Sequence, residues 1–204
     1  MTSLVRRAAD RLLELPWVYR TWQAPFASAK LRPFLARADL SRARRVLDVG
    51  CGPGTNAAIF ARSDYVGIDI NPDYIRTAAA RARGRFVVGD VADERVLPDE
   101  RFDCVFANSL MHHLDDGVVR SLLRRMSRLT APDGRVHVLD LVLPAHASAA
   151  RLLARLDRGR HARPLDTWRG LFTEHLREEH FQPYPLGLPG LPLWQMVYFV
   201  GVPK

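Results

Sequence analysis

The sequence predicts an α/β fold: a doubly wound sheet of about seven strands, mostly parallel with an antiparallel C-terminal strand, and an N-terminal helical cap. Three features of the chain support this prediction. From residue 45 onward, short apolar runs alternate with helical patterns, which is typical of a parallel sheet covered by helices. The first run ends in three glycines at alternate positions, 50, 52 and 54, directly before a helical pattern. The last two runs are joined by a loop without a helix, so they should pair antiparallel.

The chain has the size and composition of one globular domain. It has 204 residues, of which 48% are hydrophobic and 25% are charged. No apolar run approaches the ~20 residues that span a bilayer, so no membrane partner is expected. The first residues lack the apolar core of a signal peptide, which predicts a cytoplasmic protein. Cys51 and Cys104 lack the spacing of metal ligands or of a disulfide framework.

The chain is basic, with a formal net charge of +8 that is carried almost entirely by arginine; its only lysines are Lys30 and Lys204. Such a balance fits the binding of nucleic acid or of an anionic substrate. It also fits a codon bias that places arginines on solvated faces. We favour the second explanation, because no block of basic residues with interleaved aromatic residues occurs. Nucleic acid is therefore not expected as a partner, and a solvated helix face is expected for the arginines at 151, 155, 158, 160 and 163.

One domain, 1–204, is expected to contain four parts. These are a helical cap at 1–42, a cofactor-binding core at 43–143, a helical insertion at 144–178 and a C-terminal strand pair at 179–204. The cap should hold helices at 4–15 and about 26–38. It either packs against the sheet or closes as a lid over the glycine turn, with Tyr19, Trp22 and Gln23 facing the site.

The alternating patterns give the expected order of the elements. Strands are expected at 45–49, 65–70, 85–89, 102–107 and 135–141, followed by two more within 179–186 and 194–201. Helices are expected at 55–62, 72–83 and 117–129, then at 146–160 and 167–177. Asn71 and Pro72 favour a helix start, since asparagine caps a helix N-terminus and proline fits its first position. Gly84 should end that helix, and 132–134 should form a turn.

The spacing of the glycines indicates the kind of nucleotide. A dinucleotide fingerprint is G-x-G-x-x-G, and its third glycine would fall on Thr55. The chain instead has G-x-G-x-G, with Asp48 two residues before the first glycine. A carboxylate beside the turn would repel a pyrophosphate, yet it would attract an ammonium group. The turn therefore suits a nucleoside cofactor without phosphate and with an amine end.

With these motifs, the chain resembles the class I S-adenosylmethionine (SAM)-dependent methyltransferases of the small-molecule type, which have a Rossmann-like sheet. The resemblance covers about residues 45–142 and rests on four motifs in register: 46–55, 67–70, 89–91 and 102–114. It implies that Asp69 binds the ribose hydroxyls, that Asp90 accepts from the adenine amino group and that Val91 offers its backbone N–H to the ring. The cofactor-binding residues implied by the resemblance are Asp48, Gly50, Cys51, Gly52, Gly54, Asp69, Ile70, Asp90, Val91, Asn108 and Ser109.

Two histidines and an acid are the candidate catalytic residues. His112 and His113 follow the strand at 102–107, and histidine can take a proton from a hydroxyl or ammonium acceptor near neutral pH. The resemblance implies the same role for a histidine here or for an acid at Asp140. The sequence does not say which histidine faces the site, or whether one only packs in the core. A metal site that combines both histidines with Asp115 and Asp116 is disfavoured, because adjacent histidines rarely converge on one ion, so no metal is expected.

The resemblance implies transfer of a methyl group from SAM to an O, N or C nucleophile of a small molecule, such as a specialised metabolite, leaving S-adenosylhomocysteine (SAH). Amino-methylating DNA enzymes carry Asn/Asp-Pro-Pro-aromatic where this chain has 108–111, so a DNA base is not expected as the acceptor. Trp168, Phe172 and Tyr198 are expected as walls of the acceptor pocket. Three alternatives stay open: action on RNA or protein, use of SAM without methyl transfer, and an NAD(P) oxidoreductase. The oligomeric state is not predicted.

Overall fold

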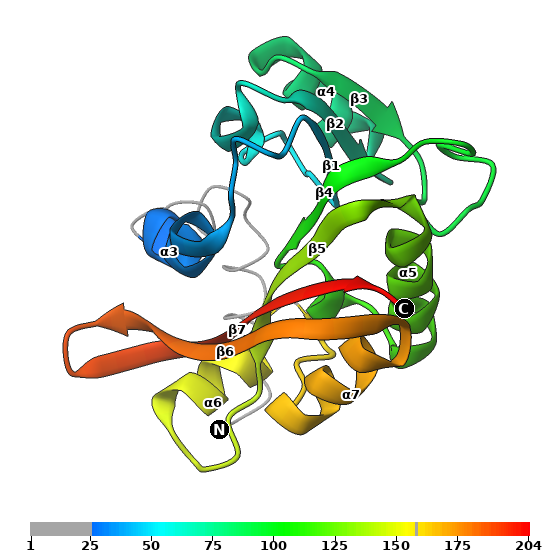
Figure 1. The fold of residues 1–204 in the computed structure, drawn as a ribbon. Helices are drawn as coiled ribbons and strands as arrows, with labels where there is room; N and C mark the ends of the chain where they lie inside the picture. The colour runs from blue at the N-terminus through cyan, green and yellow to red at the C-terminus, as the bar shows by residue number, and fades with distance from the viewer. Residues whose placement is uncertain (1–25, 158) are drawn as a thin grey trace.

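A computed structural model describes residues 26–157 and 159–204 of the chain (Figure 1). The described residues include one seven-stranded sheet with the strand order β3-β2-β1-β4-β5-β7-β6. The expected helix at 4–15 and the expected lid residues Tyr19, Trp22 and Gln23 lie outside the described residues. In the described part of the chain, no helix is long and apolar enough to cross a bilayer.

The strands confirm the predicted mixed sheet. Five of them pair in parallel: β1 (Arg45–Val49), β2 (Asp64–Asp69), β3 (Arg85–Val88), β4 (Phe102–Asn108) and β5 (Thr130–Val142). The last two, β6 (Leu176–Leu188) and β7 (Leu191–Pro203), form a long hairpin whose β7 pairs antiparallel with β5. The strand order reverses between β1 and β4, and such a switch point is where open α/β sheets bind ligands.

Helices cover both faces of the sheet (Figure 1). On one face, α5 (Asp116–Leu129) and α7 (Leu165–His175) contribute to an apolar cluster with β1, β2, β4 and β5. On the other face, α3 (Ala27–Arg37), the 3-10 turn η2 (Ala57–Phe60) and α6 (Ala149–Leu156) contribute to a second apolar cluster with β7. The sheet therefore lies between two packed layers.

The helix start at Asn71 follows the capping chemistry that the sequence predicts. Asn71 caps α4 (Pro72–Arg81) by accepting from the backbone N–H groups of Asp73 and Tyr74, at 2.9 and 3.3 Å. Asp115 caps α5 by accepting from the N–H of Val118 at 3.0 Å. Each cap satisfies backbone donors that a helix N-terminus leaves without an intrahelical partner.

Four expected elements differ in the structure. The helix predicted at 55–62 is only the single turn η2, which follows the glycine turn directly. The turn predicted at 132–134 is part of β5, which starts at Thr130. There Gly134 lets β5 approach β4 closely, since a Cβ on it would lie 2.7 Å from the carbonyl oxygen of Phe102. The helices predicted at 146–160 and 167–177 are shorter or shifted, as α6 and α7.

Candidate active site

The glycine turn after β1 presents backbone instead of side chains. Gly50, Gly52 and Gly54 have φ angles of +69°, +54° and +79°, a region that other residues rarely adopt. A Cβ on Gly50 would lie 2.7 Å from the side chain of Leu110, whereas a Cβ on Gly52 would meet nothing within 4 Å. The turn therefore needs glycine for its conformation, and at Gly52 it borders open space where a ligand can approach the backbone.

Asp48 lies fully buried beneath this turn, at the end of β1. One carboxylate oxygen, Oδ2, accepts from the hydroxyl of Tyr65 at 2.7 Å and from Nδ2 of Asn56 at 3.2 Å. The other, Oδ1, is buried and has no hydrogen-bond partner among the described residues. Burial raises the pKa of Asp48 to about 7, although both of those hydrogen bonds lower it. A buried carboxylate oxygen without a hydrogen-bond partner is costly. A ligand with a donor such as an ammonium group would supply the missing hydrogen bond.

Two further acids stand at the ends of the neighbouring strands. Asp69, at the end of β2, accepts from the backbone N–H groups of Gly52 and Asn71, both at 2.9 Å. Asp90, just beyond β3, is exposed and accepts from the N–H of Ala92 at 2.8 Å. Ile70, the residue after Asp69, is 73% exposed. Acids that flank an apolar surface fit a ligand with a polar sugar and a flat ring.

The remaining expected cofactor residues take different positions. Val91 is buried, and Cys51 turns its side chain inward, where a Cβ on Gly67 would lie 2.8 Å from its Sγ. Cys51 therefore offers only its backbone to a ligand. Asn108 donates from Nδ2 to Oδ1 of Asn56 at 3.3 Å, which joins the end of β4 to the glycine turn.

Ser109 follows β4 in a left-handed conformation, with φ at +56°. Its Oγ accepts from Nζ of Lys30 at 3.0 Å and donates to Oδ1 of Asn108 at 3.3 Å. Lys30 comes from α3, so this contact joins the N-terminal helix to the end of the central strand. The sequence predicted Ser109 at the site but gave no role to Lys30.

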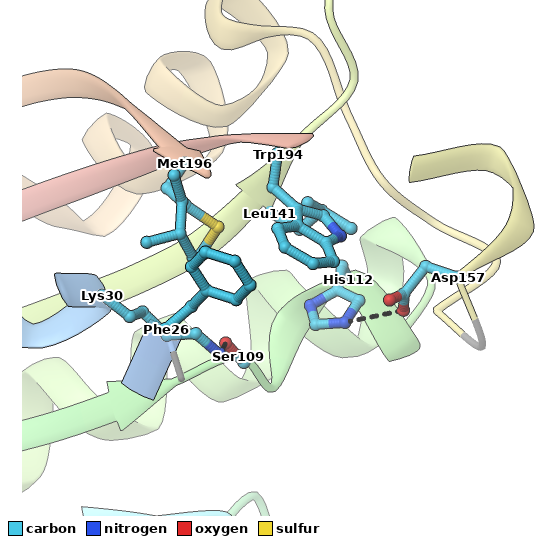
Figure 2. Close-up of a pocket in the computed structure, with 9 residues that line it drawn as sticks. Phe26, Lys30, Ser109, His112, Leu141, Asp157, Trp194 and Met196 are labelled. Atoms are coloured by element: carbon cyan, nitrogen blue, oxygen red, sulfur yellow. Dashed lines mark hydrogen bonds and ion pairs between the residues drawn. The ribbon is translucent and has the colours of Figure 1, made fainter. Parts of the chain in front are cut away.

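His112, in the 3-10 turn η3 (Met111–His113), is held between two carboxylates. Its Nδ1 lies 2.6 Å from Oδ1 of Asp140. Its Nε2 lies 3.3 Å from Oδ1 of Asp157, the contact drawn in Figure 2. Burial lowers the pKa of His112, but the charges of Asp140 and Asp157 and their hydrogen bonds outweigh burial and raise it to about 9. At neutral pH the ring is therefore an imidazolium.

Asp140 is itself fixed in place. It is fully buried at the carboxyl end of β5 and also accepts from the backbone N–H groups of Met111 and Leu141, each at 2.7 Å. The predicted pair of a histidine after β4 and an acid in β5 thus lies in direct contact. The acid from the other side, Asp157, follows α6 and accepts from the N–H of Gly159 at 2.9 Å. The sequence pattern gave no sign of it.

His113 takes a different position from His112. It is exposed, and its ring centroid lies 4.1 Å from that of His112. Ligand atoms of His112, His113 and Asp157 lie within 4.8 Å of one another, a grouping that could hold a metal ion. Asp115 and Asp116, which the disfavoured metal site would have used as ligands, are engaged elsewhere. Asp115 caps α5, and Asp116 pairs with Arg163 at 2.7 Å.

A pocket opens beside His112, and Figure 2 shows its walls. Apolar side chains supply most of the wall, and four polar side chains supply the rest. Its lining residues are Phe26, Lys30, Ser109, His112, Leu141, Asp157, Leu186, Trp194 and Met196. The phenyl ring of Phe26 meets the indole of Trp194 edge-on, with centroids 5.4 Å apart. The pocket therefore has mostly apolar walls and a polar end formed by Lys30 and His112.

The expected wall residues are not among those lining this pocket. Trp168 and Phe172 are fully buried and stack on each other in the core, with centroids 5.4 Å apart. Tyr198 is also fully buried, and its hydroxyl oxygen lies 2.9 Å from Nδ1 of His137, which is buried as well. The residues of β7 that line the pocket are Met196 and Trp194, two and four residues before Tyr198. Strand alternation identified the apolar residues but not which of them face the pocket.

Arg163 contradicts the prediction of a solvated arginine face. It is only 5% exposed and donates to the carbonyl oxygens of Met111, His161 and Leu114, at 3.1, 2.9 and 2.6 Å. Its Nε also pairs with Asp116. One guanidinium thus fixes the loop that carries His112, because its several donors can reach carbonyls that point in different directions.

Comparisons with known proteins find similar sequences and similar folds. Residues 46–134 match the sequence profile of a family described as a methyltransferase domain. An uncharacterized methyltransferase of Mycobacterium tuberculosis is 38% identical over 105 residues, which cover 49% of this chain and 52% of that protein. An O-methyltransferase of Aspergillus sclerotiorum, resE, is 32% identical over 156 residues, covering 72% of this chain and 58% of that protein. The chain thus spans about half the length of these curated relatives.

Solved structures give the same fold. The N-methyltransferase NodS from Bradyrhizobium japonicum, in complex with SAH, superposes with a TM-score of 0.71 over 98% of both chains at 20% identity. The mitomycin 7-O-methyltransferase MmcR superposes with a TM-score of 0.70 over 96% of this chain and 60% of that one, at 19% identity. Residues 46–134 therefore match a methyltransferase domain, and the described residues have the fold of solved methyltransferases.

Proposed function

We propose that this chain binds SAM at the carboxyl ends of β1, β2 and β3 and transfers its methyl group to a small-molecule acceptor in the pocket beside His112. The observation that carries the proposal is the buried oxygen Oδ1 of Asp48, which has no partner among the described residues and lies beneath three glycines of positive φ. An amino-acid ammonium would supply the missing donor. A dinucleotide would bring no such group.

Each residue of the cofactor site has a role that its position supports. Asp48 and the backbone of Gly50, Gly52 and Gly54 would hold the methionine end. Asp69 would accept from the ribose hydroxyls, because each of its oxygens keeps a free lone pair beyond the backbone N–H that it already accepts. Ile70, Asp90 and Val91 would border the adenine, and Asn108 with Ser109 would lie between the cofactor and the acceptor. When bound, SAM supplies an electrophilic methyl group on a sulfonium.

The catalytic side of the proposal favours His112 over His113, because only His112 lines the pocket. His112 and Asp140 are proposed to act together. At neutral pH the imidazolium directs Nδ1 at Asp140 and Nε2 at Asp157, so it would orient an acceptor only through Nε2 and only in place of Asp157. It would act as a base only at pH values above its pKa of about 9. Orientation of this kind supplies a large share of the rate in methyl transfer, since the methyl group is already activated.

The relatives agree with this proposal. Both resE and MmcR are named O-methyltransferases, and NodS is named an N-methyltransferase. The pocket walls are apolar, and three of them, Phe26, Trp194 and Met196, are large. A small organic acceptor therefore fits better than an RNA or a protein, and a cytoplasmic location remains an expectation.

Isothermal titration with SAH, SAM and NAD tests the cofactor assignment. We expect SAH and SAM to bind with micromolar affinity and NAD not to bind. Binding of NAD alone would overturn the proposal in favour of an oxidoreductase. A salt-dependent affinity for tRNA, measured in the same buffer series, would favour the RNA alternative instead. Binding of SAM without any SAH formation across a broad panel of acceptors would favour a role of SAM without transfer.

A further inference from the structure

Lys30 reaches the acceptor pocket from outside the cofactor core. Its Nζ donates to Oγ of Ser109 at 3.0 Å, and its side chain lines the pocket next to Phe26 (Figure 2). Its backbone is also fixed, because the hydroxyl of Tyr184 in β6 donates to the carbonyl oxygen of Lys30 at 2.8 Å. The ammonium is thus positioned by contacts at both ends of the residue.

The groups that face Lys30 come from three other elements. Asp140 belongs to β5, Asp157 follows α6, and His112 belongs to η3. Burial lowers the pKa of Lys30, although the charges of Asp140 and Asp157 raise it. His112 is shifted in the opposite direction. The pocket therefore holds a histidine that keeps its proton and a lysine that gives up its proton more readily than usual.

The choice of lysine at this position is informative because the chain otherwise uses arginine. Of 30 basic residues, only Lys30 and Lys204 are lysines. Arginine binds anions at least as well and holds its charge at any physiological pH, so a site for fixed positive charge would suit it. Lysine differs because its ammonium can lose a proton when buried, which allows acid–base chemistry.

We propose that Lys30 is the catalytic base of this pocket and that the acceptor is a flat, apolar compound with an ionisable hydroxyl group, such as a phenol. The inference rests on the proposed function. The neutral amine takes the hydroxyl proton as the oxygen forms its bond to the methyl carbon. The carbon–sulfur bond breaks, its electron pair remains on sulfur as SAH, and the Lys30 ammonium later returns the proton to water.

Titration of the lysine amines tests the first requirement without any acceptor. With lysine labelled by ¹³C and ¹⁵N in the full chain, NMR should show one Nζ signal for Lys30 and one for Lys204, assigned with the Lys204→Met variant. Lys204, which is exposed at the C-terminus, is an internal control. We expect Lys30 to titrate at least about one pH unit below Lys204. If Lys30 and Lys204 titrate at the same pH, the proposal is overturned.

A matched pair of acceptors tests the role in proton transfer. We would use 2-naphthol, which must lose a proton, and 2-naphthalenethiol, which is largely ionised at neutral pH. The readout is SAH formation at pH 7. Lys30→Arg, which keeps the charge, and Lys30→Met, which removes it, should both slow transfer to 2-naphthol by about 10²-fold or more. In the same two variants, transfer to the thiol should slow far less. The control variant Lys204→Met should leave both rates unchanged.

The outcomes separate this inference from the proposed function. If SAH binds but wild-type protein methylates neither probe, the proposed class of acceptor is wrong. If methyl transfer to both acceptors slows equally in the Lys30 variants, Lys30 has only a structural role and the inference fails. If added ethylamine partly restores the activity of Lys30→Ala toward 2-naphthol but not toward the thiol, the inference is supported. If SAH itself does not bind, the proposed function fails, whatever the lysine titration shows.

Discussion

Nδ1 of His112 and Oδ1 of Asp140 lie 2.6 Å apart, although 27 residues separate them in the chain. Both side chains are buried, and Asp140 takes two further hydrogen bonds from backbone N–H groups. A carboxylate held in this way fixes the orientation of the ring. It also makes the positive charge of His112 part of the folded structure, with consequences for stability.

Stability should depend on pH through His112. Its pKa is raised in the folded protein from 6.5 to about 9. The folded state therefore binds the proton more tightly, and this stabilisation is complete below pH 6.5 and is lost as pH rises to about 9. The loss is roughly 3 kcal/mol in the free energy of unfolding. Urea unfolding at pH values from 6 to 9.5 measures it. His112→Asn should flatten the dependence and His113→Asn should not; an unchanged slope in His112→Asn would contradict this assignment.

Asp69→Ala should weaken SAH binding by about 2 kcal/mol, because the ribose hydroxyls lose a charged acceptor. The substitution also removes the acceptor for the N–H of Gly52, which adds to the loss. Asp73→Ala is a suitable control, since Asp73 is an exposed acid in the first turn of α4. Titration calorimetry gives both affinities. Equal affinities in the wild type and Asp69→Ala would remove the ribose role.

SAH affinity should rise with pH through the titration of Asp48. The pKa of Asp48 is raised to about 7 by burial, and only the ionised form attracts an ammonium group. Affinity should therefore be about tenfold higher at pH 8 than at pH 6. Asp48→Asn should bind SAH weakly and independently of pH over this range. A wild-type affinity that does not change with pH would show that Asp48 does not receive the cofactor amine.

Loss of the Arg163 guanidinium should destabilise the protein. Arg163→Met leaves three backbone carbonyls and Asp116 without their donor, so we expect a loss of about 2–4 kcal/mol in the free energy of unfolding. Arg160→Met, in the same segment, changes an exposed residue and should cost less than about 0.5 kcal/mol. Chemical denaturation compares the two variants. Equal losses would mean that the buried contacts of Arg163 contribute little.

Metal removal should leave the protein unchanged. His112, His113 and Asp157 are close enough to hold an ion, but His112 already carries a proton between two carboxylates. A metal would have to displace that proton, whose pKa is about 9. We therefore expect incubation with EDTA or with excess zinc to leave the melting temperature within about one degree. A large zinc-dependent rise that His113→Asn removes would instead identify a metal site.

The local chemistry of the fold could be predicted from the chain. Alternating apolar and helical patterns placed every strand of the sheet, because period and turn residues are local properties. The helix start at Asn71, the glycine turn and the acids at strand ends were also predicted, since each follows directly from a strand or a cap. Boundaries were less exact where tertiary pairing extends a strand, as at Thr130.

The acceptor side depended on contacts between distant segments. Lys30, Asp157 and Trp194 come from three separate parts of the chain, and no local pattern marks any of them as pocket residues. Arg163 looks like its solvated neighbours in the sequence, yet it is buried because carbonyls of the loop after β4 happen to converge on it.

The sequence therefore indicated the class of cofactor that we propose, because the proposed site uses one short turn and the residues that end successive strands. Packing of α3, α6 and the β6–β7 hairpin over the carboxyl ends of the sheet decided which side chains surround the acceptor. It also decided the protonation of His112 and Lys30, since burial and neighbouring charges exist only in the folded chain.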